Sequence, residues 1–121
     1  MAIDPQWSGD YPYPTFYMKA GDRLPEFVVQ LMYADGSFKD LTDHTATLVI
    51  KRAVGGRQVL SANMTLSDPE LESGYATYEW AAPLEEGEYL MEVRIAVEGE
   101  SSIRETFPRN GYMKLVVNAS L

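Results

Sequence analysis

His44 is the only histidine of the chain, and its ring could act as a base in catalysis. A histidine base needs a nucleophile beside it and an acid that orients its ring. The sequence has no cysteine, and it has no Gly-x-Ser-x-Gly segment that would place a serine on a sharp turn. Asp43 precedes His44 in a segment that is typical of a turn. We therefore interpret His44 as an exposed turn residue and predict that the protein is not an enzyme.

Three neighbouring carboxylates, Glu85, Glu86 and Glu88, could in principle transfer protons or hold a cation. An acid–base pair needs burial, or two close like charges, to separate its pKa values. These residues flank Gly87 in a stretch that is typical of a turn, where neither condition holds. We interpret the cluster as a solvated connection that leads into a core strand.

A second set of carboxylates, Asp35, Asp40 and Asp43, could contribute oxygen ligands to Ca²⁺. Their spacing does not follow an EF-hand loop, and a weak surface ion stays open as the alternative. Gly55-Gly56 is not followed by Lys and then Ser or Thr, so it does not form a phosphate-binding loop. The sequence therefore predicts no resident metal and no cofactor.

Aromatic side chains are a further source of binding chemistry, and three of them lie in residues 1–14. This segment also contains three prolines, which favour extended geometry. One interpretation is an arm that folds back over its own domain. The other is an arm that docks on a neighbouring subunit with Trp7, Tyr11 and Tyr13 as its anchors, and both can hold.

Tyr78 and Trp80 alternate with Thr77 and Glu79, so the two rings share one face of a predicted strand. Exposed rings would form a platform for a carbohydrate or a peptide, whereas buried rings would belong to a core. The alternation favours the core. A carbohydrate- or cell-surface-binding module remains as the alternative function of a different class.

The strand that organises these residues is predicted at Tyr89–Val97. Five large apolar residues alternate there with residues that include Glu92 and Arg94, which indicates one buried and one polar face. Tyr89 follows Gly87 by two residues. This is the pattern of a tyrosine corner, whose phenol OH bonds back to the preceding connection. We interpret the stretch as the central strand of an immunoglobulin-like sandwich.

Further short strands are predicted at intervals of about 8–12 residues. Asp35-Gly36 predicts a hairpin turn, and Asp68-Pro69-Glu70 predicts one helical turn. Because no long helical period occurs, we expect residues 15–121 to form an all-β antiparallel sandwich of seven to nine short strands, with a small closed barrel as the main competitor. The other predicted strands are 15–20, 26–33, 37–41, 45–51, 58–66, 75–80, 102–107 and 112–117.

Composition restricts the partners. The 121 residues carry 18 acidic and 10 basic side chains, a formal net charge of −8, which disfavours binding to nucleic acid. No stretch approaches the length of a membrane span, and residues 1–14 have neither a basic start nor an apolar run, so no signal peptide is predicted. The lack of cysteine fits assembly in a reducing cytoplasm.

The order of several short motifs resembles the N-terminal-domain family of the baseplate upper protein of tailed bacteriophages. The resemblance covers about residues 16–117 and depends on five pieces in register. These are Ala20-Gly21-Asp22-Arg23-Leu24-Pro25, Asp35-Gly36-Ser37 with Asp40-Leu41-Thr42, Gly74-Tyr75-Ala76-Thr77-Tyr78-Glu79-Trp80, Glu86-Gly87-Glu88-Tyr89, and Thr106-Phe107-Pro108-Arg109-Asn110-Gly111-Tyr112.

The resemblance implies an immunoglobulin-like structural domain of a virion, assembled in the host bacterial cytoplasm, with other virion proteins as partners and several copies on a symmetric particle. In the namesake, such a domain attaches to the baseplate core, and the rest of the chain carries receptor-binding proteins. This sequence ends at residue 121 without such a stalk. We therefore expect a tail or baseplate adaptor or accessory subunit, with a capsid decoration protein as the alternative.

Overall fold

A computed structural model describes residues 15–23, 26–31, 33, 37–67, 74–81, 83–108 and 111–119. This part of the chain is all-β: it forms nine strands in two sheets, and it contains no helix. The predicted class and number of strands are confirmed. The predicted helical turn at 68–70 and the predicted turn at Asp35-Gly36 lie outside the described residues.

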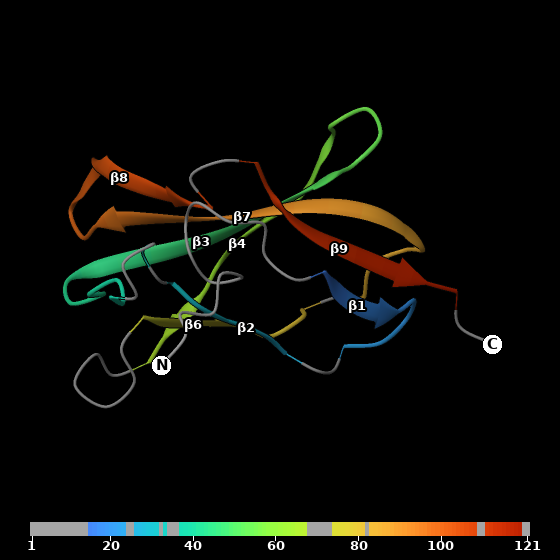
Figure 1. Cartoon of the computed structure of the whole chain (residues 1–121), viewed down its shortest axis with the longest axis horizontal. Helices are drawn as coiled ribbons and strands as arrows, with labels where there is room; N and C mark the ends of the chain where they lie inside the picture. The colour runs from blue at the N-terminus through green and yellow to red at the C-terminus, as the bar shows by residue number, and fades with distance from the viewer. Residues whose placement is uncertain are drawn as a thin grey trace.

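The larger sheet has six strands and the smaller one has three (Figure 1). The strands of the large sheet are β1 (Phe16–Lys19), β3 (His44–Arg52), β4 (Gln58–Asn63), β7 (Gly87–Val97), β8 (Glu100–Phe107) and β9 (Met113–Asn118). Those of the small sheet are β2 (Phe27–Gln30), β5 (Thr65–Leu66) and β6 (Tyr75–Tyr78). The order is β1-β9-β7-β3-β4 in the large sheet, with β8 also paired to β7, and β2-β6-β5 in the small one.

β7 is the central strand, as its alternation predicts. β3 pairs with it in antiparallel register from Tyr89 to Val97. The opposite edge of β7 is shared, because β9 pairs with its first half and β8 pairs with its second half. In Figure 1, β3 and β7 extend through most of the length of the molecule, above the small sheet.

The core lies between the two sheets. The alternating apolar residues of β7 are buried, whereas Glu92 and Arg94 are only partly covered. Phe16 of β1 contacts Phe27 of β2 edge to face, with ring centroids 5.3 Å apart, so this pair connects the two layers. The largest fully buried side chains are Tyr89, Phe107, Leu31, Leu48, Ile50, Met91, Ile95, Met113, Leu115, Val29 and Val93.

The predicted strand at 58–66 is wrong as a single element. β4 pairs with β3 in the large sheet, but β5 pairs with β6 in the small sheet. Met64 lies between them, and its N–H donates to the carbonyl of Ala46 at 2.9 Å. The alternation continues through this point because Met64 is itself buried in the core. Periodicity therefore could not reveal that the chain changes sheets there.

The predicted strands at 26–33 and 37–41 are also too long. β2 ends at Gln30, and the N–H of the next residue, Leu31, donates a 2.7 Å hydrogen bond to the carbonyl of Gly74. Residues 37–41 form a single β-bridge and no strand. Two backbone hydrogen bonds nevertheless connect the two segments, from Tyr33 N–H to the carbonyl of Ser37 at 2.8 Å and from Lys39 N–H to the carbonyl of Leu31 at 2.9 Å.

One pairing departs from the predicted antiparallel arrangement. β1 pairs with β9 in parallel, with Phe16 opposite Leu115 and Lys19 opposite Asn118. All the other pairings found among the described residues are antiparallel. Parallel pairing brings the segment that follows the predicted arm beside the last strand of the chain.

Candidate functional site

The residues predicted to dock on a partner, Trp7, Tyr11 and Tyr13, lie outside the described residues. Their role stays a prediction. β1, which follows this segment, is placed at the side of β9 in the large sheet.

Tyr78 and Trp80 are core residues. They are 5% and 2% exposed, and their rings pack edge to face with centroids 5.1 Å apart. The core interpretation is confirmed. An aromatic platform for a carbohydrate would need exposed rings, and this pair does not provide them.

The cluster Glu85, Glu86 and Glu88 lies at the surface, as predicted. Glu85 forms an ion pair with Arg52 at 3.1 Å, and the carbonyl of Glu85 accepts a 2.7 Å hydrogen bond from the phenol of Tyr89. The predicted hydrogen bond of the tyrosine corner is thus present. Burial raises the pKa of Tyr89, opposed by the charge of Arg52. These contacts hold the connection at the start of β7.

Asp40 and Asp43 lie in the connection before β3. Asp40 Oδ1 accepts a 2.9 Å hydrogen bond from the backbone N–H of Thr42, which lowers the pKa of this carboxyl. Asp43 has a positive φ of 57°. The described residues contain no group of His, Asp and Glu side chains that could hold a metal ion, and Asp35 lies outside them.

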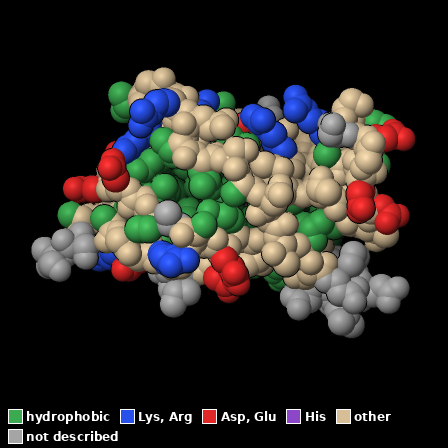
Figure 2. All heavy atoms as spheres, turned by 180° about the vertical axis from the view of Figure 1, so that it is seen from behind, with side chains coloured by type: hydrophobic (Ala, Val, Ile, Leu, Met, Phe, Trp, Pro, Cys, Tyr) green, Lys and Arg blue, Asp and Glu red, His purple; other side chains and the backbone are tan. Residues whose placement is uncertain are grey.

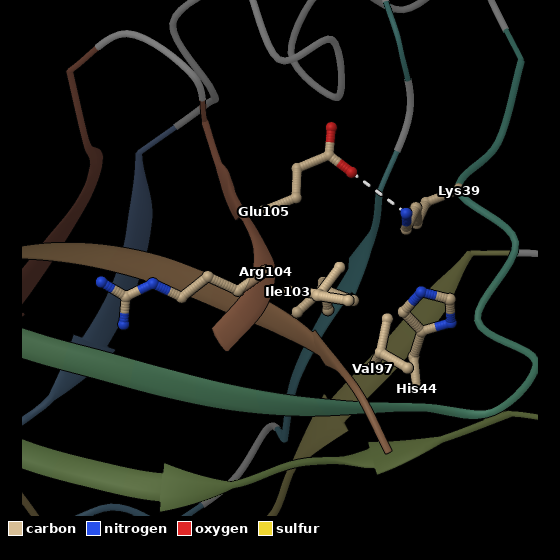
Figure 3. A pocket seen from close by; sticks show the side chains of 7 residues that line it. Lys39, His44, Val97, Ile103, Arg104 and Glu105 are labelled. Atoms are coloured by element: carbon tan, nitrogen blue, oxygen red, sulfur yellow. Dashed lines mark ion pairs between the residues drawn. The ribbon is translucent and has the colours of Figure 1, made fainter. Parts of the chain in front are cut away.

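His44 is the first residue of β3 and is partly buried, so its interpretation as an exposed turn residue is wrong. Its ring Nδ1 lies 2.6 Å from the carbonyl oxygen of Thr42. A carbonyl at that distance fixes the ring orientation. His44 also lines a cleft of about 370 Å³, shown in Figure 3.

The cleft lies where β3, β7 and β8 meet the segment before β3. In Figure 3 the side chains of Val97, Ile103 and His44 gather on one side of it, whereas that of Arg104 extends away. Ile103 is 54% exposed, so the apolar side of the cleft is open to solvent. The cleft is lined by Lys39, His44, Ile95, Val97, Ile103, Arg104 and Glu105.

The polar part of the cleft is an ion pair that also accepts a hydrogen bond from a phenol. Glu105 Oε1 lies 3.1 Å from Lys39 Nζ and accepts a 2.9 Å hydrogen bond from the hydroxyl of Tyr33. Burial opposes the charged form of Lys39, but the hydrogen bond and the charge of Glu105 outweigh it and raise the pKa of the ammonium. Burial and the hydrogen bond to Glu105 both raise the pKa of Tyr33. The arrangement favours a protonated phenol beside a closed ion pair.

The polar groups of the cleft are held by contacts within the fold. The Glu105 carboxylate already has a cation and a hydroxyl as partners, and the His44 ring is oriented by a backbone carbonyl. The cluster was not predicted from the sequence. The one sequence feature that could have indicated it is Glu105, a charged residue at the inward position between Ile103 and Phe107.

The chain matches no family model and no curated protein. The described residues contain no helix long and apolar enough to cross a membrane. A proposal of function therefore depends on the surfaces of this sandwich and on the motifs of the sequence.

Proposed function

We propose that this protein is a non-enzymatic structural subunit of a bacteriophage particle. In this proposal it is an immunoglobulin-like adaptor or accessory subunit of a tail or baseplate. It docks on larger assemblies through residues 1–14 and through the edges of its sheets. The motif order from Ala20 to Tyr112 supports the phage assignment, and the exposed strand edges support the mode of docking.

The docking mode depends on one observation. In the part of the chain that the structure describes, three strands are paired along one edge only, and each of them exposes a large apolar side chain. Among the described residues, β1 pairs only with β9, β2 only with β6, and β8 only with β7. Each of them exposes a large apolar side chain: Tyr17 on β1 at 64%, Val28 on β2 at 43% and Ile103 on β8 at 54%. An extended segment of a partner gains backbone hydrogen bonds from such an edge and side-chain burial from such residues.

The polar groups of the domain favour a structural role over a catalytic one. Glu105, Asp40 and His44 each contact a group of the fold itself, at 2.6–3.1 Å. Repetition of the subunit around a symmetric particle multiplies individually weak contacts. For the carbohydrate-binding alternative, burial of Tyr78 and Trp80 removes the platform that motivated it.

The proposal is tested by asking whether the chain enters particles. A tagged copy is expressed in the host of the phage that encodes it, and particles are purified by sedimentation. We expect the tagged chain in the particle fraction, at repeated positions by negative-stain electron microscopy. Absence of the chain from intact particles would exclude a virion role.

The arm is tested with two variants. One lacks residues 1–14, and the other replaces Trp7, Tyr11 and Tyr13 by Ser. We expect both to fold, because the buried core cluster of the described residues lies at or after Met18. Both should be lost from the particle fraction. Calorimetry on the purified variants is the control, and a large fall in melting temperature would show that the arm belongs to the core.

A further inference from the structure

The outward face of the large sheet has an unusual charge. Alternation directs Met91, Val93 and Ile95 inward, so the residues between them face outward. Half of the ten basic residues of the chain occupy outward positions on this sheet. We call them the basic face; they are Lys19, Lys51, Arg94, Arg104 and Lys114.

Among the described residues of β1, β3, β4, β7 and β9, the carboxylates at outward positions are Glu88 and Glu92, and Glu92 is paired with Arg94 at 3.1 Å. The five cations of the basic face and these two carboxylates sum to +3, whereas the whole chain carries −8. The remainder of the molecule therefore carries −11. Figure 2 shows Lys and Arg side chains mostly along the upper side of the molecule, where the large sheet lies in Figure 1.

The basic face also has apolar and aromatic groups at its centre. Leu90 lies between Lys114 of β9 and Lys51 of β3 in one cross-strand row. Tyr17 and Val116 form a pair in the next row. Tyrosine and aliphatic groups are typical of the centre of a protein-binding surface, and the cations around them supply charge for recognition.

Lys51 is held in place on this face. Its Nζ donates a 2.8 Å hydrogen bond to the hydroxyl of Tyr112 and lies 4.2 Å from the centroid of the Tyr112 ring. A cation over an aromatic ring loses less conformational freedom when it binds an anion. The face therefore presents a partly preorganised positive charge.

The complementary surface is at one end of the same molecule. Three exposed carboxylates lie in the connections before β3 and after β7, and a fourth, Glu100, begins β8; the two connections are joined by a 2.9 Å hydrogen bond from Glu98 N–H to the carbonyl of Asp43. We call this surface the acidic end; its residues are Asp40, Asp43, Glu98 and Glu100. It lies beyond Val97, where β7 ends, whereas Lys51 and Lys114 of the basic face lie opposite Leu90, in the first half of β7.

We propose that the acidic end of one copy docks on the basic face of the next copy. The two surfaces are different patches of one molecule, so the contact is head-to-tail and generates a ring or an open stack instead of a closed pair. The inference deepens the proposed function and rests on it, since it supplies a contact between neighbouring copies of a subunit that a symmetric particle carries in several copies. Opposite charge supplies the specificity, because two basic faces repel each other.

Self-association of the purified full-length chain tests this inference. Sedimentation velocity over a concentration series should show oligomers at about 0.05 M salt that dissociate at about 0.5 M, since surface charges are screened at the higher value. Lys114→Glu should weaken the association about tenfold or more. Arg57→Glu, in the exposed turn between β3 and β4, is the matched control with the same change in net charge and should leave it unchanged.

Complementation makes the test independent of folding defects. Copies with Lys19→Gln and Lys114→Gln keep their acidic end, and copies with Glu98→Gln and Glu100→Gln keep their basic face. Each variant alone should be monomeric. A mixture of the two should form a heterodimer that grows no further, because only one pair of intact surfaces is available.

A wild-type chain that is monomeric at low salt would overturn the inference. So would oligomers that respond equally to Lys114→Glu and Arg57→Glu, or a mixture that fails to associate. None of these outcomes would overturn the proposed virion role, because a monomer can still dock on a different virion protein. Loss of the chain from particles would instead overturn the proposed function.

Discussion

The phenol of Tyr89 donates a 2.7 Å hydrogen bond to the carbonyl of Glu85, four residues earlier, and closes the connection that leads into the central strand. Tyr89 is 2% exposed, so its ring is part of the core while its hydroxyl reaches the segment outside. The cation of Arg52 lies over the ring, 4.7 Å from its centroid, and forms an ion pair with Glu85. One side chain thus fixes both the start of β7 and the position of the preceding turn.

Tyr89→Phe should therefore destabilise the domain by about 1–2 kcal/mol, because it removes the hydrogen bond and leaves the carbonyl of Glu85 without this donor. Urea unfolding measures the change. Tyr17→Phe is the control, since Tyr17 is 64% exposed and its replacement should change the free energy of unfolding by less than about 0.5 kcal/mol. Equal effects of the two substitutions would contradict a special role for the corner.

A second prediction concerns the close approach of Gly74 to Leu31. A Cβ at Gly74 would lie 2.8 Å from the carbonyl oxygen of Leu31, and the residue has a φ of +81°. Gly99 has a similar φ of +84°, but a Cβ added there would meet no atom within 4 Å. Gly99→Ala should cost about 1–2 kcal/mol for its backbone conformation.

Gly74→Ala should exceed that cost by at least about 1 kcal/mol, because the backbone of Leu31 has to move. The pair of variants isolates the steric part, since both glycines adopt left-handed conformations. Thermal unfolding of the two variants measures it. A Gly74 variant as stable as the Gly99 variant would show that β2 and β6 are less tightly joined than the structure indicates.

A third prediction concerns alkaline pH. The pKa of Tyr33 is raised from 10.0 and that of Lys39 from 10.5, so the folded state binds both protons more tightly than the unfolded state does. Their contribution to stability is complete below those ordinary values and is lost as the pH rises through the raised ones. The free energy of unfolding should fall above about pH 10, with a slope of at most about 1.4 kcal/mol per pH unit for each proton.

Tyr33→Phe should make this fall shallower, because a phenylalanine has no proton to lose. Urea unfolding at several values between about pH 8 and about pH 11 measures the slope. Tyr17→Phe serves again as the control and should leave it unchanged. A slope that is the same with and without the Tyr33 hydroxyl would mean that the phenol near Glu105 does not couple to folding.

The sequence predicted those features that depend on local alternation. The apolar residues of β7 recur at every second position, so the strand, its buried face and the corner at Tyr89 could all be inferred before any contact was known. The same argument placed Tyr78 and Trp80 in the core. In each case, neighbours along the chain carry the information.

Only the tertiary structure decided which segments meet. Met64 continues the alternation of β4 although the chain changes sheets there, and the parallel pairing of β1 with β9 joins segments from opposite ends of the sequence. Tyr33 and Glu105 are 72 positions apart. The alternation also showed which residues face outward but not that five cations share one surface. Such groupings depend on the order of strands in a sheet, and that order is set by long-range packing and hydrogen bonding.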